Sequence, residues 1–167
     1  MYLELIFLVL LILSTLLCAL VSGLVFAFTI VIMPGIKKLP DKEFIRAFQV
    51  MDGVIQNGQP IFIFVWVGSV LTLLASAILG IWQLDGIQRI LLILAAIIYI
   101  FGVHLPTVTI NIPLNNEIQA IDTVSASEST QNTARSNFES RWNFWNSFRT
   151  VLGILVSILL MILLYNL

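Results

Sequence analysis

The C-terminal stretch Arg141–Leu167, RWNFWNSFRTVLGILVSILLMILLYNL, indicates the class of protein to which this chain belongs. From Val151 to Tyr165, only a glycine and a serine interrupt a run of apolar and aromatic residues. A helix needs about 20 predominantly apolar residues to cross a bilayer. We therefore expect a membrane-spanning helix over residues 141–165, which begins with a short stretch rich in Trp, Asn and Arg.

The composition of the whole chain is that of an integral membrane protein. Of its 167 residues, 59% are hydrophobic and only 10% are charged, whereas soluble domains carry about 25% charged residues. We therefore expect the lipid bilayer as the main partner. The net charge of −1 provides no basic surface for nucleic acid. The single cysteine, Cys18, excludes an internal disulfide.

Three further apolar runs precede the C-terminal one. Expected spans lie at about residues 5–33, 60–84, 87–112 and 141–165. Lipid cannot satisfy backbone polar groups, so runs of this length must cross the membrane as helices. The predicted fold is an all-α, integral membrane four-helix bundle in one domain, residues 1–167.

The first connection has a helical pattern of its own. Apolar residues Phe44, Phe48, Met51 and Ile55 fall on one helical face, and Asp41 can cap the start. This pattern predicts an amphipathic helix over residues 41–57. We expect this short amphipathic helix between the first two spans to lie in the membrane interface. Packing on the end of the bundle is an alternative that is compatible with that position.

The third connection includes a polar stretch, DTVSASESTQNTARSN, at residues 122–137. It is rich in Ser, Thr and Asn, a composition typical of loops. We expect a flexible loop there, or at best a marginal helix.

Basic residues predict the orientation, because loops rich in Lys and Arg stay in the cytoplasm. The first and third connections carry most of them: Lys37, Lys38, Lys42, Arg46, Arg135 and Arg141. We expect a multi-pass protein of the cell membrane. Loops 34–59 and 113–140 should be cytoplasmic, with both termini outside.

Ionisable residues inside a membrane are costly, so each is a functional hypothesis. His104 lies inside the third span, and Thr107, Asn111 and Asn115 follow it at helical spacing on the same face. The alternative for His104 is a structural hydrogen bond between helices. For the asparagines, the alternative is that they join helices.

The fourth span begins with a polar and aromatic stripe. Trp142, Trp145, Asn146 and Arg149 stand at i, i+3, i+4 and i+7, so they share one helical face. We expect this face to form the wall of a polar pocket that faces the third span. The alternative for the tryptophans is a role as interfacial anchors.

The sequence predicts no metal site. A single histidine, a single cysteine and carboxylates that lie mostly in connections give no recognisable ligand set.

Three motifs carry a family resemblance: Met33-Pro34, Asn111-Ile-Pro-Leu-Asn115, and the segment from Trp142 to Thr150. In this order and spacing they resemble the anthrone oxygenase-like family of small four-span membrane proteins, most of them of unknown function. The resemblance covers nearly the whole chain. It implies an oxygenase that acts on an anthrone-like polycyclic phenol without a metal or flavin cofactor.

The resemblance also suggests roles for the polar residues. His104 would act as the base, and Arg149 with Asn111 or Asn146 would stabilise the enolate. The substrate would bind against these asparagines and Asn115, with its rings stacked on Trp142 and Trp145. The alternative function is non-catalytic: a membrane protein that binds a lipid, a quinone-like molecule or a partner subunit.

Overall fold

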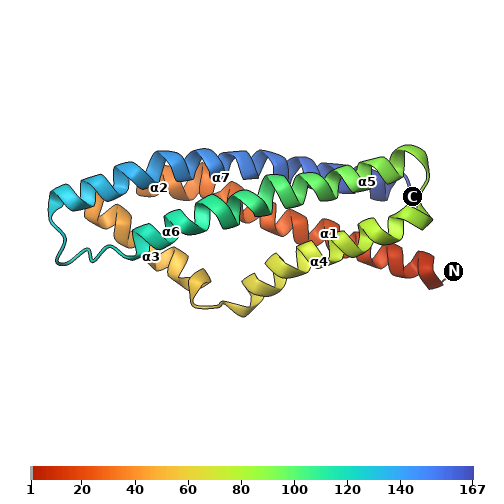
Figure 1. The fold of residues 1–167 in the computed structure, drawn as a ribbon, viewed down its shortest axis with the longest axis horizontal. Helices are drawn as coiled ribbons and strands as arrows, with labels where there is room; N and C mark the ends of the chain where they lie inside the picture. Colours follow the sequence, from red (N-terminus) through yellow and green to blue (C-terminus); the bar gives the residue numbers. More distant parts are fainter. Residues whose placement is uncertain (1) are drawn as a thin grey trace.

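The structure is a computed structural model that describes residues 2–167, and these contain helices and connections but no strand. This confirms the predicted all-α membrane fold. Figure 1 shows long helices running side by side, with both chain termini at the end opposite α3. The helical elements are α1 (Tyr2–Ala27), η1 (Phe28–Ile32), α2 (Met33–Ile36), α3 (Asp41–Gln56), α4 (Pro60–Gln83), α5 (Gly86–Ile98), η2 (Tyr99–His104), η3 (Thr107–Asn111), α6 (Ile112–Gln119) and α7 (Glu128–Tyr165), where η marks a π-helical segment.

Four continuous helices are long and apolar enough to cross a membrane: Tyr2–Ile36, Pro60–Gln83, Gly86–Gln119 and Glu128–Tyr165. Their number and order match the predicted spans. The third and fourth helices extend beyond the predicted boundaries, on the side where α3 lies.

The internal prolines of these helices do not end them, because a π-helical segment comes before each of these prolines. Segments η1, η2 and η3 come just before Pro34, Pro106 and Pro113. A proline ring clashes with the carbonyl group four residues earlier, and the wider π turn relieves that crowding. The third span therefore continues through Pro113 to Gln119 instead of stopping at residue 112.

The polar stretch 122–137 divides at Ser127. The Ser127 hydroxyl accepts a hydrogen bond from the backbone N–H of Thr130 at 3.2 Å and so caps α7. Residues 128–137 then form the first turns of α7, and only residues 122–127 lie outside a helix. The cap and tertiary contacts give this Ser/Thr-rich segment a helical structure that its composition did not favour.

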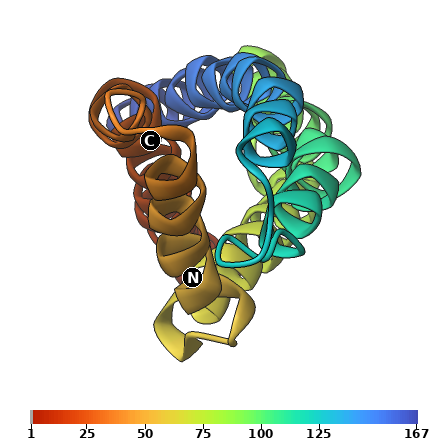
Figure 2. The ribbon, with the colours of Figure 1, turned by 90° about the vertical axis from the view of Figure 1, so that its left-hand side faces the viewer.

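The long helices pack in a ring. Helix α1 packs against α4 and α7, α4 packs against α5, and the third span returns to α7 through α5 and η2. Figure 2, which looks along the helices from the α3 end, shows this ring. The interior contains a hydrophobic core that includes Leu11, Leu73, Tyr99 and Val156.

Hydroxyl pairs join the first span to its neighbours at three levels. Ser14 meets Ser76 of α4 at 3.0 Å, whereas Ser22 and Thr29 meet Ser157 and Thr150 of α7 at 3.4 and 3.0 Å; in each pair the distance joins the two hydroxyl oxygens. Small polar residues allow close helix approach and hydrogen bonding where lipid offers no competing partner.

Helix α3 packs on the end of the bundle, and its position in the membrane interface stays a prediction. Its buried residues Phe44 and Phe48 belong to a second core shared with Phe138 and Trp142 of α7. The rings of Phe48 and Phe138 meet edge to face, with centroids 4.6 Å apart. The apolar face of α3 therefore contacts protein.

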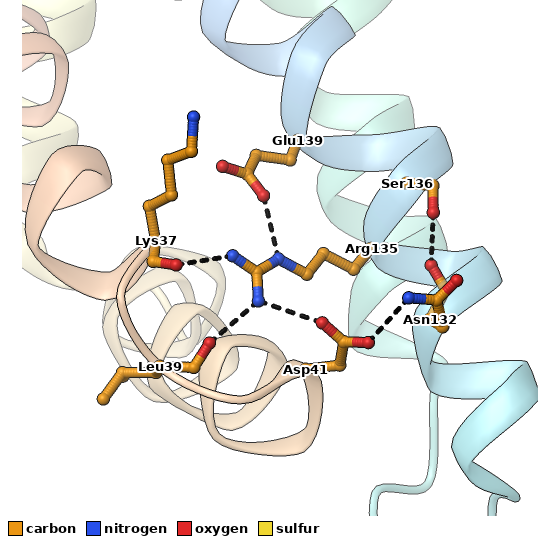
Figure 3. Close-up of polar contacts among 7 residues, drawn as sticks. All are labelled: Lys37, Leu39, Asp41, Asn132, Arg135, Ser136 and Glu139. Atoms are coloured by element: carbon orange, nitrogen blue, oxygen red, sulfur yellow. Dashed lines mark hydrogen bonds and ion pairs between the residues drawn. The ribbon is translucent and has the colours of Figure 1, made fainter.

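A single arginine fixes the connection between α2 and α3 to α7. The Arg135 guanidinium donates to the carbonyls of Lys37 and Leu39 at 2.7 and 2.8 Å, and to the carboxylates of Asp41 and Glu139 at 2.9 and 2.8 Å (Figure 3). These contacts come from both sides of the connection and from α7 itself. They set the position from which α3 reaches the end of the bundle.

Candidate ligand-binding cavity

A cavity of about 220 Å³ lies between α3 and the neighbouring halves of the four long helices. Its wall is mostly apolar, and Leu24, Phe28, Phe62, Trp66, Ile112 and Trp142 contribute to it. The polar lining residues are Asp52, Thr107, Asn111, Asn115, Asn146 and Arg149. An apolar cavity with a few convergent polar groups is the usual form of a small-molecule site.

The π-helical segments shape this cavity. Phe28 begins η1, and η3 contains both Thr107 and Asn111. A π turn inserts an extra residue and changes which side chains face inward, and such turns are frequent at functional sites. The prolines that follow these segments thus contribute indirectly to the cavity.

Arg149 provides a buried positive charge at one end of the cavity. Only 5% of this residue is exposed. One terminal nitrogen donates to the Thr107 hydroxyl at 2.7 Å, and the other donates to the Asn146 side-chain oxygen at 2.6 Å. Its Nε has no hydrogen-bond partner. Because both partners are neutral, the charge is solvated but not balanced, and an anionic ligand group would balance it.

Asn146 is held so that its oxygen faces Arg149. Its side-chain nitrogen donates to the Val25 carbonyl at 2.9 Å and to the Thr29 hydroxyl at 2.7 Å. These two contacts with the first span fix the amide orientation. Asn146 therefore positions the guanidinium in addition to lining the cavity.

Asn111 adds an unpaired acceptor close to the same end. Its nitrogen donates to the Trp142 carbonyl at 3.4 Å, but its side-chain oxygen is buried without a partner. A buried polar atom without a partner costs about 1–3 kcal/mol. Arg149 Nε and Asn111 Oδ1 are thus two buried polar atoms without a hydrogen-bond partner, both on residues that line the cavity.

Asp52 lies in the lining of the cavity on the α3 side. It is 4% exposed. Its carboxylate accepts hydrogen bonds from the side-chain amides of Gln56, Asn115 and Gln119 at 2.6, 2.7 and 3.0 Å. The sequence reasoning missed this residue. Its signal was present, since Asp52 follows Phe48 by four residues and so lies on the buried face of α3.

Trp142 forms the wall between the two polar ends. Its indole nitrogen donates to the Asn115 side-chain oxygen at 2.7 Å. Its ring packs against Phe48 and Phe28, with centroid separations of 5.5 and 5.7 Å. The Arg149 guanidinium carbon lies 5.9 Å from the centre of the ring. This indole is therefore held on several sides and offers a fixed surface to a flat ligand.

The structure brings together five of the seven residues that the sequence suggested. These are Asn111, Asn115, Trp142, Asn146 and Arg149, all in the cavity lining.

Trp145 does not line the cavity. Its ring packs against Phe144 and Phe148 of its own helix, with centroids 5.6 and 5.4 Å away. At about 100° per residue, Trp145 is turned about 60° from Trp142, whereas Asn146 and Arg149 deviate less. The expected shared face is therefore narrower than the spacing suggested.

His104 lies behind the wall and outside the cavity lining. Its ring packs edge to face between Trp66 and Tyr99, at 4.8 and 4.7 Å between centroids. Its Nε2 is buried without a partner. Trp66 does line the cavity, so His104 supports a wall residue in this conformation.

The available chemistry is that of a cation, a carboxylate and several amides. Within residues 2–167, no three His, Cys, Asp or Glu side chains are grouped so that they could hold a metal ion. The polar residues of the cavity can bind an oxyanion, donate and accept hydrogen bonds, and exchange a proton at Asp52.

Comparison with known families finds one matching model, described as anthrone oxygenase, over residues 51–159. The match covers more than half of the chain and includes every polar residue of the cavity. No curated protein and no solved structure matches the chain significantly.

Proposed function

Because the chain belongs to the anthrone oxygenase family, we propose that it oxidises an anthrone-like polycyclic phenol in the cavity described above. The observation that carries the proposal is the state of Arg149. It is a buried cation in the lining of a mostly apolar cavity, and both of its hydrogen-bond partners are neutral. A substrate that forms an enolate would supply the missing negative charge.

The proposed reaction needs only the substrate and O₂. Loss of a proton from the central CH₂ of the anthrone gives a delocalised enolate. This anion donates an electron to O₂, and the resulting radicals combine to form a C–O bond. Protonation gives a hydroperoxide, and loss of water then forms the new carbonyl. Overall, anthrone and O₂ give anthraquinone and H₂O, so the carbon loses four electrons and O₂ gains four.

Arg149 has the central role in this proposal. The charge of the enolate develops on its oxygen, and a preorganised donor is most effective where charge develops. Asn146 holds the guanidinium in place, and the fixed ring of Trp142 supports the aromatic system. Asn111 accepts a hydrogen bond from a hydroxyl group of the substrate.

Asp52 is the base in this proposal, because it lines the cavity and can accept a proton there. The sequence had suggested His104, which packs behind Trp66. Thr107 and Asn115, the partners of Arg149 and Asp52, are separated by about 12 Å along the helix axis. A flat ligand between them can place its oxygen near the guanidinium and its CH₂ near the carboxylate.

Oxygen uptake tests the proposal directly. The purified protein in detergent is supplied with a hydroxylated anthrone, while an oxygen electrode and the quinone absorbance follow the reaction. We expect Arg149→Gln to lower kcat/KM by about 100-fold or more, as for the loss of an oxyanion donor. The control is Arg141→Gln, on the same helix but exposed, which should behave like the wild type.

Two further variants distinguish between Asp52 and His104 as the catalytic base. Asp52→Asn should abolish the reaction, whereas His104→Gln should retain most of it. The reverse result would return the role of base to His104. A wild-type rate no higher than spontaneous oxidation in detergent alone would reject the oxygenase. Quinone binding without turnover would then indicate a non-catalytic binding protein.

We also propose that the α3 end of the bundle faces the cytoplasm and that both termini lie outside the cell membrane. The basic residues of loops 34–59 and 113–140 support this orientation, and both termini lie at the opposite end of the molecule (Figure 1). Lys38 and Leu167 are both exposed. Single cysteines introduced at these two positions should differ in how they are labelled in intact cells. A membrane-impermeant maleimide should label only the C-terminal one; the opposite labelling would reverse the orientation.

A further inference from the structure

We infer that the ligand reaches the cavity from within the bilayer, through a lateral window between the N-terminal half of α4 and the segment η3–α6. This inference rests on the proposed function for the nature of the ligand, a flat hydrophobic molecule. It adds the route by which such a molecule enters and the residues that border the route.

The packing of α4 provides the first observation. Its main partners are α1 and α5, and neither η3 nor α6 is among them. Figure 1 shows α4 sloping away from α6 toward its N-terminal end. Only 17% of its most apolar window is buried, against 39–44% in the other three spans. Helix α4 is therefore the span that the rest of the protein covers least.

One border of the window is a contact between Trp66 of α4 and His104 of η2. Their ring centroids lie 4.8 Å apart, and the Tyr99 ring supports His104 from the other side at 4.7 Å. This contact joins α4 to the third span deeper in the bundle. In this contact, His104 has a structural role, because its ring supports the ring of Trp66.

The other border is a polar seam between α3 and α6. Asp52 accepts from Asn115 and Gln119 at 2.7 and 3.0 Å, and the Gln49 amide donates to the Ile118 carbonyl at 2.9 Å. These hydrogen bonds close the cavity toward the end where α3 lies. Entry there would require several of them to break, whereas entry between α4 and α6 requires none.

The side chains between the two borders are apolar. Phe62 and Ile112 line the cavity from opposite sides of the window. Ile112 is 43% exposed on the outer surface of α6. Phe62 stacks on Trp66 with a centroid separation of 5.5 Å and an angle of 23° between rings. A rotation of Phe62 away from Trp66 would therefore widen the opening without breaking a hydrogen bond of its side chain.

The chemistry of the route suits a molecule dissolved in lipid. A flat aromatic ligand leaves water for the hydrocarbon region spontaneously. It then meets an opening lined by apolar side chains at membrane depth. Its polar edge reaches Arg149 and Asn111 only inside the cavity, where these groups are shielded from lipid.

Blocking the window tests this inference. Cysteine is introduced at Ile112, at Val108 or at Asn116, and each variant is labelled with a bulky maleimide. Val108 and Asn116 are exposed neighbours on the same continuous helix and do not line the cavity. The native Cys18 is fully buried and should not react. The probe is anthraquinone, whose association with protein in liposomes is followed by quenching of tryptophan fluorescence.

We expect the label on Ile112→Cys to slow both association and dissociation of anthraquinone at least tenfold. The labels at Val108→Cys and Asn116→Cys should leave the rates within twofold of the unlabelled proteins. Phe62→Ala, without a label, should accelerate association several-fold. Equal rates in the three labelled variants, or slowing only at Asn116→Cys, would overturn the lateral route. So would a raised Kd for labelled Ile112→Cys without slower association.

The binding readout separates this inference from the oxygenase proposal. If the label on Ile112→Cys slows anthraquinone association but the protein consumes no O₂, the result would support the route and reject the reaction. Oxygen consumption by a protein in which the label on Ile112→Cys leaves the association and dissociation rates of anthraquinone unchanged would support the reaction and reject the route.

Discussion

The indole nitrogen of Trp142 donates to the side-chain oxygen of Asn115 over 2.7 Å, a contact that joins α7 to α6 at the wall of the cavity. The nitrogen of the same Asn115 amide donates to Asp52 of α3 at 2.7 Å. One asparagine thus connects three helices and uses both ends of its side chain. This relationship makes the cavity wall and the fold depend on the same residue.

Replacing Asn115 should therefore destabilise the protein. In Asn115→Ala, the Trp142 indole loses its acceptor and Asp52 loses one of three donors, at a cost of about 1–3 kcal/mol. Thermal unfolding in detergent measures the change. The control is Asn116→Ala, at the exposed neighbouring position, which should change the stability little. Equal effects of the two variants would show that the contact contributes nothing specific.

The two tryptophans of the fourth span should differ in ligand binding. Trp142 lines the cavity and Trp145 does not. We expect Trp142→Phe to weaken anthraquinone binding about tenfold, because the ring becomes smaller and loses its hydrogen bond to Asn115. Trp145→Phe should bind within twofold of the wild type. Calorimetric titration in detergent measures both, and a larger loss in Trp145→Phe would contradict the site as described.

Gly153 allows α7 to approach α1 closely. A methyl group at this position would lie 2.6 Å from the Ser22 hydroxyl oxygen and 3.3 Å from its Cβ. Gly153→Ala should therefore cost about 1–3 kcal/mol through overpacking. The matched control is Gly23→Ala, where nothing lies within 4 Å of the added carbon. That variant should match or exceed wild-type stability, since alanine favours helix more than glycine does. Denaturant titration in mixed micelles would compare the two, and equal losses would exclude the steric explanation.

Asp41 should make the attachment of α3 sensitive to acid. Hydrogen bonds from Asn132 and Arg135 lower the pKa of this carboxyl below its ordinary value of 3.8, against a smaller opposing effect of burial. The folded-state pKa is depressed, so the stabilisation is complete above 3.8 and is lost as the pH falls through the lower folded-state value. The protection of α3 amides against hydrogen exchange, corrected for the pH dependence of intrinsic exchange, should thus fall on acidification in this range. Asp41→Asn should reduce the pH dependence of exchange; an unchanged profile would assign the acid sensitivity to other groups.

The candidate site could be predicted in part because helical spacing groups residues on a face. Asn111 and Asn115 stand one turn apart, as do Trp142 and Asn146, and all four line the cavity. Spacing alone could not separate Trp145 from Trp142, since both lie within the arc that a helical face covers. Nor could it place His104, whose position depends on the π turn in which it lies.

Composition and hydropathy alone were enough to predict the class of the protein and the number of its spans. Four apolar runs of this length must form helices in a membrane, because each backbone polar group has to find its partner within the same helix. That requirement is local, so it can be read from composition and periodicity.

Which polar groups meet depends on how the helices pack in three dimensions. Asp52 comes from a different helix and joins Asn115 through packing between α3 and α6. The rotation of each helix about its axis depends on side-chain shape at the contacts, including Gly153 against Ser22, and on the π turns before the prolines. Contacts of this kind involve residues far apart in the chain, so no local pattern contains them.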